Sequence, residues 1–231
     1  PWDIPDLPPG ALADLQASRR IAVTIASSIE AIAAHAPTGN ARAVADVAHE
    51  PRLRAYLVAD ARDLVATRAD LVRHGDAPNV AGIKVHGEWS GVATADPAMS
   101  ALFALLAEHG RPVKIHNTGP GWDEALRRIA DRHPALPIIV AHAGEGSPSV
   151  AAARLAAATA NVHVELASSF AALAEVRALV ALAPRDRILF GTDSPLLDPA
   201  FVVGTYVDAG LDPATDPGVF REAAARLFGI S

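Results

Sequence analysis

The segment Arg187-Ile-Leu-Phe-Gly-Thr-Asp-Ser-Pro195 is an apolar run that leads almost directly to an aspartate. Such a run is typical of a parallel strand covered on both faces. Asp193 then lies where the strand ends, and parallel α/β folds bind ligands at the carboxyl ends of their strands. An aspartate before Ser-Pro is also ordinary turn chemistry. Asp193 alone is therefore ambiguous, and the earlier strands must decide.

Six earlier segments have the same apolar character, and helix-forming segments separate them. We predict strands at 20–28, 54–59, 80–86, 112–116, 136–142, 162–167 and 187–195. We predict helices at 11–19, 41–50, 61–74, 96–109, 122–133, 148–160, 171–182, 199–209 and 217–228. Residues 1–10 hold four prolines and are expected to form a loop. This alternation implies an α/β fold with a parallel sheet and crossover helices.

Seven strands are one fewer than a (β/α)8 TIM barrel requires. The barrel would be complete if one further strand preceded Pro1, and the proline-rich opening would then be the loop that leaves it. Residues 1–231 are expected to form one domain of this kind. An open doubly wound sheet is the alternative. It is weakened because no Gly-x-Gly-x-x-Gly loop follows any predicted strand.

Composition excludes several classes of function. The chain has no cysteine, so any metal must bind through nitrogen and oxygen. A formal net charge of −6 and a pI near 5.8 argue against a nucleic-acid surface. No apolar run approaches the ~18 residues of a membrane span, and residues 1–10 do not resemble a signal peptide. We expect a cytoplasmic protein that binds a small molecule; a homo-oligomer is compatible with the sequence, which does not fix the oligomeric state.

Polar side chains gather near the ends of several predicted strands. Residues two apart in a strand share a face, and the outer face of a barrel strand meets apolar helices, so polar pairs should point inward. The pairs are Lys84 with His86, Lys114 with His116, and His163 with Glu165. His142 and Asp193 end their strands in the same region. Imidazole and carboxylate groups suit Zn2+, whose bound water ionises near a pKa of ~7. Asp193 beside such a water could accept its proton.

An ordered set of motifs carries a family resemblance. The motifs are Gly82-Ile-Lys-Val-His86, Val113-Lys-Ile-His116, Val140-Ala-His-Ala-Gly144 and Leu189-Phe-Gly-Thr-Asp-Ser-Pro195. Over residues 20–228 the chain resembles the amidohydrolase superfamily, in particular the amidohydrolase-2 group of metal-dependent hydrolases and decarboxylases. The resemblance implies a TIM barrel with a divalent metal, Zn2+ first and Mn2+ second.

The resemblance also implies roles for individual residues. It makes His116 a metal ligand, His142 a second ligand or a catalytic acid/base, and Asp193 a ligand or the group that activates water. Lys84 corresponds to a lysine that is carboxylated in some branches, although an ordinary charged contact to substrate is favoured here. The family's His-x-His strand is missing. Either that strand lies upstream of Pro1, or the chain belongs to a branch that lost it and binds metal weakly or not at all.

Other residues are weaker candidates. His86 is expected to contact substrate, and Trp89 and Trp122 either line the pocket mouth or simply pack a loop on the barrel. His163 and Glu165 are candidates for a second layer that orients a ligand. His35 is a candidate for the rim. The remaining histidines lie near helix C-termini and are interpreted as structural: His49, His74, His109 and His133.

Three functions follow as hypotheses. The first is a metal-dependent hydrolase that acts on an ester, lactone or amide bond of a small organic acid. The second is a non-oxidative decarboxylase of an aromatic or unsaturated carboxylate, in which Lys84 or an arginine holds the carboxylate. The third is a metal-free barrel that only binds a ligand, which the missing His-x-His keeps open.

Overall fold

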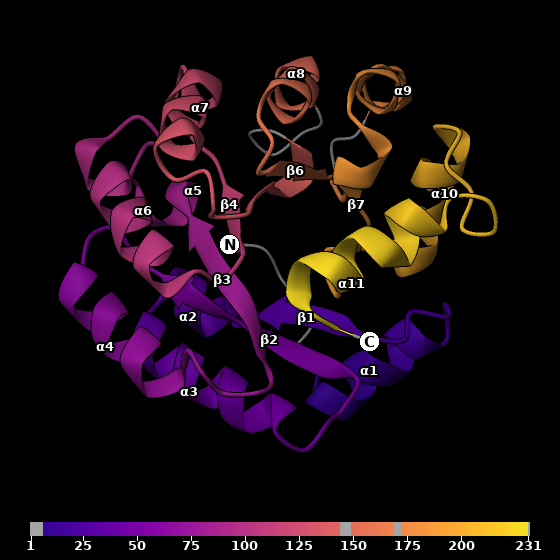
Figure 1. Ribbon diagram of the computed structural model, residues 1–231. Coiled ribbons are helices and arrows are strands. Elements are labelled where there is room, and N and C mark those ends of the chain that lie inside the picture. The colour runs from indigo at the N-terminus through magenta and orange to yellow at the C-terminus, as the bar shows by residue number, and fades with distance from the viewer. Residues whose placement is uncertain (1–6, 144–148, 169–171, 231) are drawn as a thin grey trace.

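The fold is a curled parallel sheet surrounded by helices (Figure 1). The computed structural model describes residues 7–143, 149–168 and 172–230. Within these residues the sheet has seven strands, hydrogen-bonded in chain order and all parallel. They are β1 (Thr24–Ser27), β2 (Leu53–Ala59), β3 (Val80–His86), β4 (Val113–His116), β5 (Ile138–Val140), β6 (Val162–Glu165) and β7 (Ile188–Leu189). The predicted TIM-barrel-like fold is confirmed.

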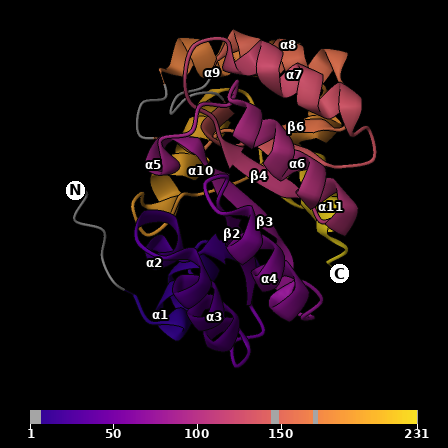
Figure 2. The same cartoon turned by 90° about the vertical axis from the view of Figure 1, so that its left-hand side faces the viewer.

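Helices connect each strand to the next. They are α1 (Pro9–Ala17), α2 (Ile29–Ala33), α3 (Ala36–Val47), α4 (Leu64–His74), α5 (Gly87–Ser90), α6 (Pro97–His109), α7 (Trp122–Arg132), α8 (Val150–Ala158), α9 (Leu173–Leu182), α10 (Pro199–Asp208) and α11 (Ala223–Phe228). Single turns of 3-10 helix lie at Ala141–Ala143 and Arg185–Arg187, and a π-helical turn lies at Gly218–Glu222. Figure 2 shows α4 and α6 on the outer side of β3 and β4. No helix in the described part of the chain is long and apolar enough to cross a bilayer.

Three boundaries differ from the sequence prediction for local reasons. Residues 29–33 form α2, which is not among the predicted helices, because the Ser28 side chain accepts a hydrogen bond from the Ala31 N–H and caps the helix. α1 begins at Pro9, since a proline in the first turn needs no partner for a missing N–H. β7 has only two residues, so the last three positions before Asp193 do not continue the strand.

The two faces of the sheet have different chemistry. Outward-facing residues such as Leu57, Ile83 and Val113 are fully buried in the main core beneath the helices. The register pairs Val58 with Lys84 and Lys84 with Lys114, so these three side chains share the opposite, inner face. The inward orientation expected for the polar residues therefore follows from strand alternation.

α11 crosses the opening between β7 and β1, which do not pair within the described residues (Figure 1). Its apolar side packs against Ile139 and Leu189 on the inner face. The Phe228 ring meets the Tyr56 ring edge to face, with 5.9 Å between ring centres. α11 thus covers a part of the barrel interior that none of the described strands covers.

Tyr206 of α10 joins the ends of the last two strands. Its hydroxyl donates to the Leu189 carbonyl at 2.9 Å and accepts from the Leu166 N–H at 3.1 Å. The side chain is fully buried beside the rings of Phe190 and Phe220. Because β7 is so short, this hydroxyl supplies hydrogen bonds that a longer strand would supply itself.

Tyr206→Phe should lower the free energy of unfolding by roughly 1–3 kcal/mol, because it leaves a buried donor and a buried acceptor without partners. Urea unfolding followed by circular dichroism measures this change. Val207→Thr, on the exposed side of the same helix, is the control and should stay within about 0.5 kcal/mol of the parent. Equal stability of Tyr206→Phe and the parent would show that the hydroxyl is not needed to join β6 and β7.

Candidate functional site

The inner face opens into a cavity of about 1800 Å3. Its wall includes Lys84, His86, His116, His142 and Asp193, so the structure brings these predicted residues together at the carboxyl ends of β3, β4, β5 and β7. The volume exceeds the ~300–1,000 Å3 of ordinary ligand pockets. The cavity also extends past β1 to α1 and α11, through the opening that no described strand fills.

Three histidine rings lie together on one side of this cavity. The rings of His86 and His116 are stacked, with 4.2 Å between centres and 16° between planes. The His142 ring meets His116 edge-on at 5.0 Å. The Nδ1 atom of His86 accepts a hydrogen bond from the Trp89 N–H at 3.4 Å, which turns the ring at the start of α5. The strand ends thus form one cluster of imidazoles.

These imidazoles are neutral at pH 7. Burial, followed by the nearby charge of Lys84, lowers the pKa of His86 to about 2 and that of His116 to about 3. Burial also lowers the pKa of His142, although Glu165 and Asp193 oppose that change. Neutral rings keep lone pairs, so the cluster can accept protons or hydrogen bonds.

Lysine is used in this chain only at the cavity. The sequence has two lysines, Lys84 and Lys114, against eighteen arginines. The two occupy paired positions on β3 and β4. Lys114 is ion-paired with Glu165 at 2.9 Å between Nζ and Oε2. Lys84 is 6% exposed and has no ion pair within the described residues. The two amines therefore have different surroundings despite being neighbours.

The pKa values of the two lysines move in opposite directions. Burial, and then repulsion by Lys114, lowers the pKa of Lys84 to about 7, although Asp193 and Glu165 oppose the shift. Burial also disfavours the charge on Lys114, but Glu165 outweighs burial and raises its pKa above the ordinary value. Lys114 is therefore a permanent cation, whereas Lys84 is an amine that titrates near neutral pH.

Two of the candidate residues have unusual backbone conformations. His142 has φ of 55° and Asp193 has φ of 52°, in the left-handed region that non-glycine residues rarely adopt. Such a conformation costs about 1–2 kcal/mol per residue. Strained backbone of this kind clusters at functional sites, because the surrounding structure holds a side chain where function needs it. The backbone after β5 and after β7 thereby places both side chains in the cavity wall.

The sequence did not point to Glu88 or Gln16. Glu88, on α5, places its Oε2 atom 3.2 Å from Nε2 of His116. Gln16, on α1, is 1% exposed and donates from Nε2 to the Thr192 hydroxyl at 3.0 Å, next to Asp193. Glu88 could have been suspected because it follows His86 by two residues at a strand end. Nothing local distinguishes Gln16 from other helix residues.

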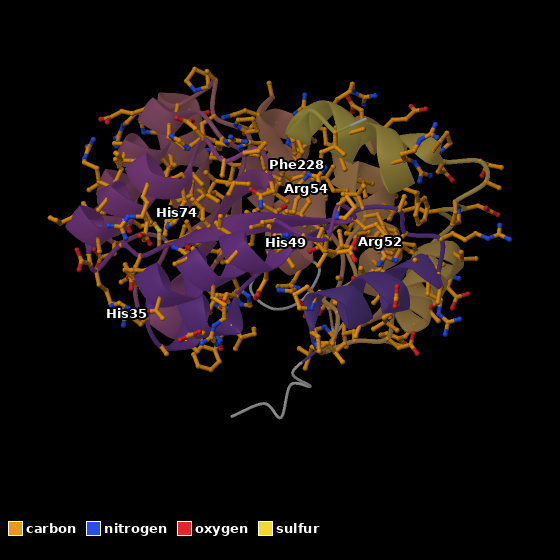
Figure 3. The ribbon with its side chains drawn as sticks, turned by 90° about the horizontal axis from the view of Figure 1, so that it is seen from below. His35, His49, Arg52, Arg54, His74 and Phe228 are labelled. Atoms are coloured by element: carbon orange, nitrogen blue, oxygen red, sulfur yellow. The ribbon has the colours of Figure 1, made fainter. Side chains whose placement is uncertain are left out.

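The remaining predicted residues fall into two groups. Trp89 is 45% exposed and lines the cavity, whereas Trp122 is 9% exposed and belongs to the main core at the start of α7. Trp122 therefore packs the helix layer and is not part of the cavity wall. His163 shares the inner face with Glu165, but its neighbours Asp186 and Arg187 lie at the opposite end of the strands. Figure 3 shows His35 and His74 among the outer helices of the N-terminal half.

The predicted metal ligands do not form a complete set. Among the described residues, no three His, Asp or Glu side chains form a group that could hold a metal ion. His116 directs Nε2 to Glu88, and its Nδ1 atom is buried without a hydrogen-bond partner. The Nδ1 atom of His142 is hydrogen-bonded to the Ala167 carbonyl oxygen. The metal-binding roles of His116, His142 and Asp193 therefore stay predictions, and no chemical step is derived through a metal.

The family of the chain follows from sequence comparison. A family model described as amidohydrolase matches residues 4–230. The chain belongs to the amidohydrolase family. No curated protein sequence matches it.

Solved structures of this family share the fold. A 5-carboxyvanillate decarboxylase from Sphingomonas paucimobilis has a TM-score of 0.73 at 16% identity, over 98% of this chain and 84% of the other. A 2,6-dihydroxybenzoate decarboxylase from Rhizobium has 0.71 at 18%, over 94% and 87%. A 5-carboxyvanillate decarboxylase from Novosphingobium aromaticivorans, complexed with manganese and a nitrobenzoic acid, has 0.72 at 18%, over 94% and 78%. At these identities the likeness establishes the amidohydrolase fold alone.

The two lysines should titrate separately. With 13Cε-labelled lysine, NMR of this amidohydrolase should give two side-chain signals, because the chain has two lysines. The chemical shift of the Lys84 signal should change with a midpoint near pH 7. The shift of the Lys114 signal should stay at its protonated value through pH 10. Lys84→Met assigns the signals. Two midpoints near the ordinary lysine value of about 10.4 would contradict the unequal environments.

His116→Ala tests the predicted metal ligand. If His116 holds a divalent metal, the parent loaded with Zn2+ or Mn2+ and then desalted should retain more metal by elemental analysis than His116→Ala, because a zinc site normally has three or four protein ligands and the variant loses one. Equal metal content in the two proteins would contradict the predicted role of His116.

Proposed function

We propose that this amidohydrolase is a non-oxidative decarboxylase of a small aromatic or unsaturated carboxylate. The observation that supports this most is the pair of cavity lysines, of which Lys84 alone has no carboxylate partner among the described residues. A buried ammonium without a counter-ion attracts an anion, because the anion restores the interactions lost on burial. Similar folds in decarboxylases of aromatic acids are consistent with the proposal.

Substrate recognition in this proposal begins with charge. Lys114 and Glu165 neutralise one another, and the charge of Lys84 is left for the substrate carboxylate. The bound carboxylate raises the pKa of Lys84 and keeps it protonated. Trp89 and the stacked rings of His86 and His116 offer apolar faces to an aromatic ring.

Proton transfer then uses the same lysine. The carbon that carries the carboxylate takes a proton from the Lys84 ammonium. The bond from that carbon to the carboxylate breaks, its electron pair stays with the substrate, and CO2 leaves. Lys84 regains a proton from water. In the empty site the pKa of Lys84 is about 7, so once the carboxylate has left as CO2 the amine is again close to the pH at which general acids and bases work best.

Lys84→Met should abolish CO2 release from an active aromatic carboxylate, with a loss of at least ~100-fold in kcat, the usual scale for a general acid. Lys84→Arg should keep KM within a few-fold and still lose kcat, because guanidinium holds a carboxylate but does not give up its proton. A panel of hydroxybenzoates and unsaturated acids, with CO2 detection, provides the assay. Full activity of Lys84→Met would exclude this role.

Ester, lactone or amide hydrolysis is a second candidate. It is favoured by His142, whose Nε2 lone pair is free because Nδ1 donates to a carbonyl, and by Asp193 nearby. Either group can take a proton from attacking water. Acid production without CO2 release, lost in Asp193→Asn, would favour hydrolysis. Ligand binding without turnover, unchanged in His116→Ala and Asp193→Ala, would instead favour a barrel that only binds.

A further inference from the structure

Glu165 has more contacts than a counter-ion for Lys114 needs. It is 3% exposed on the inner face at the end of β6. One carboxylate oxygen, Oε2, lies 2.9 Å from the Lys114 ammonium. The other, Oε1, accepts a hydrogen bond from the Ala167 N–H at 2.5 Å. Burial alone would raise the pKa of Glu165, but the adjacent charge of Lys114 outweighs burial and lowers it. The side chain is therefore a carboxylate with both oxygens occupied.

Ala167 links this carboxylate to His142. Its N–H donates to Glu165, and its carbonyl oxygen faces Nδ1 of the His142 ring. A carbonyl oxygen can only accept, so the His142 proton resides on Nδ1. In this tautomer of the neutral ring, Nε2 carries a lone pair and can accept a hydrogen bond or a proton. The position of Ala167 thus determines which nitrogen of His142 carries the proton.

Gly191 shows how closely the carboxylate is held. A methyl group at Gly191 would overlap the carboxylate of Glu165, although the backbone of Gly191 has no positive φ that would itself require glycine. The absence of a side chain there makes room for Glu165 at the end of β7. Lys114 of β4, the backbone that follows β6 and the glycine that follows β7 therefore all contribute to placing this one group.

We propose that Glu165 is a positioning residue that fixes the tautomer and orientation of His142 through the backbone of Ala167. The inference deepens the proposed function, on which its catalytic meaning rests: a neutral His142 with a free Nε2 can accept a hydrogen bond or proton from substrate or water. Outer groups that orient a histidine in this way commonly change activity by about 10–100-fold.

The test is the protonated nitrogen of His142, observed by 15N NMR of histidine side chains at pH 7.5 and assigned with His142→Gln. The parent should carry the proton on Nδ1. Glu165→Gln should give a mixture of tautomers, because an amide has one acceptor where the carboxylate has two. Its oxygen turns to Lys114, and its NH2 then opposes the Ala167 N–H. In a substrate assay the same variant should lose about 10–100-fold in kcat with KM nearly unchanged.

A second substitution provides a rescue. Adding Lys114→Met to Glu165→Gln removes the competing cation, so the amide oxygen can return to Ala167 and the Nδ1 tautomer should recover. Gly191→Ala should disturb the tautomer without changing any charge, and it keeps the test available if Glu165→Gln does not fold. Gly204→Ala, with open space around the added methyl group, and the exposed Glu175→Gln are the matched controls.

A proton on Nε2 in the parent would overturn the inference. An unchanged Nδ1 tautomer in both Glu165→Gln and Gly191→Ala would overturn it as well. The NMR result does not depend on turnover. If no substrate releases CO2 while the tautomer responds as expected, the proposed function fails and the positioning role stands.

Discussion

The alternation of side chains along parallel strands is the constraint on which the rest of this structure depends. Each strand must present apolar residues to the helices, because those residues form the main core. The same backbone then presents every second residue to the interior, where Lys84, Lys114 and Glu165 lie. Sliding a strand by one residue would exchange the two sets and bury charge under the helices. Core stability and site geometry are therefore fixed by one register.

The interior combines charges that would be costly separately. Lys114 and Glu165 neutralise each other in an ion pair. Lys84, with a pKa of about 7, is then the cavity amine whose protonation changes most easily near neutral pH. The neutral histidines add lone pairs without adding charge. An anion that enters this site is attracted to Lys84, because the charge of Lys114 is already compensated by Glu165.

Much of this arrangement could be predicted from the sequence. The inward pairs Lys84 with His86 and Lys114 with His116 followed from a period of two, and the order of the strand-end motifs indicated the family. Local sequence could not show that Trp122 packs in the core, because its burial depends on the helices around α7. The hydrogen bond from Gln16 to Thr192 joins residues 176 positions apart, so no local pattern reports it. The link from Glu165 to His142 passes through backbone atoms, which carry no signal in the identity of Ala167.

The distribution of basic residues has a practical consequence. All eighteen arginines provide the positive charge outside the two cavity lysines, so the outer surface carries no lysine ammonium. Reagents that acylate amines and ordinary lysine crosslinkers will find their side-chain targets only inside the barrel. Lysine modification, which labels the outer surface of most proteins, would here measure access to the cavity. The attached groups would also block the cavity.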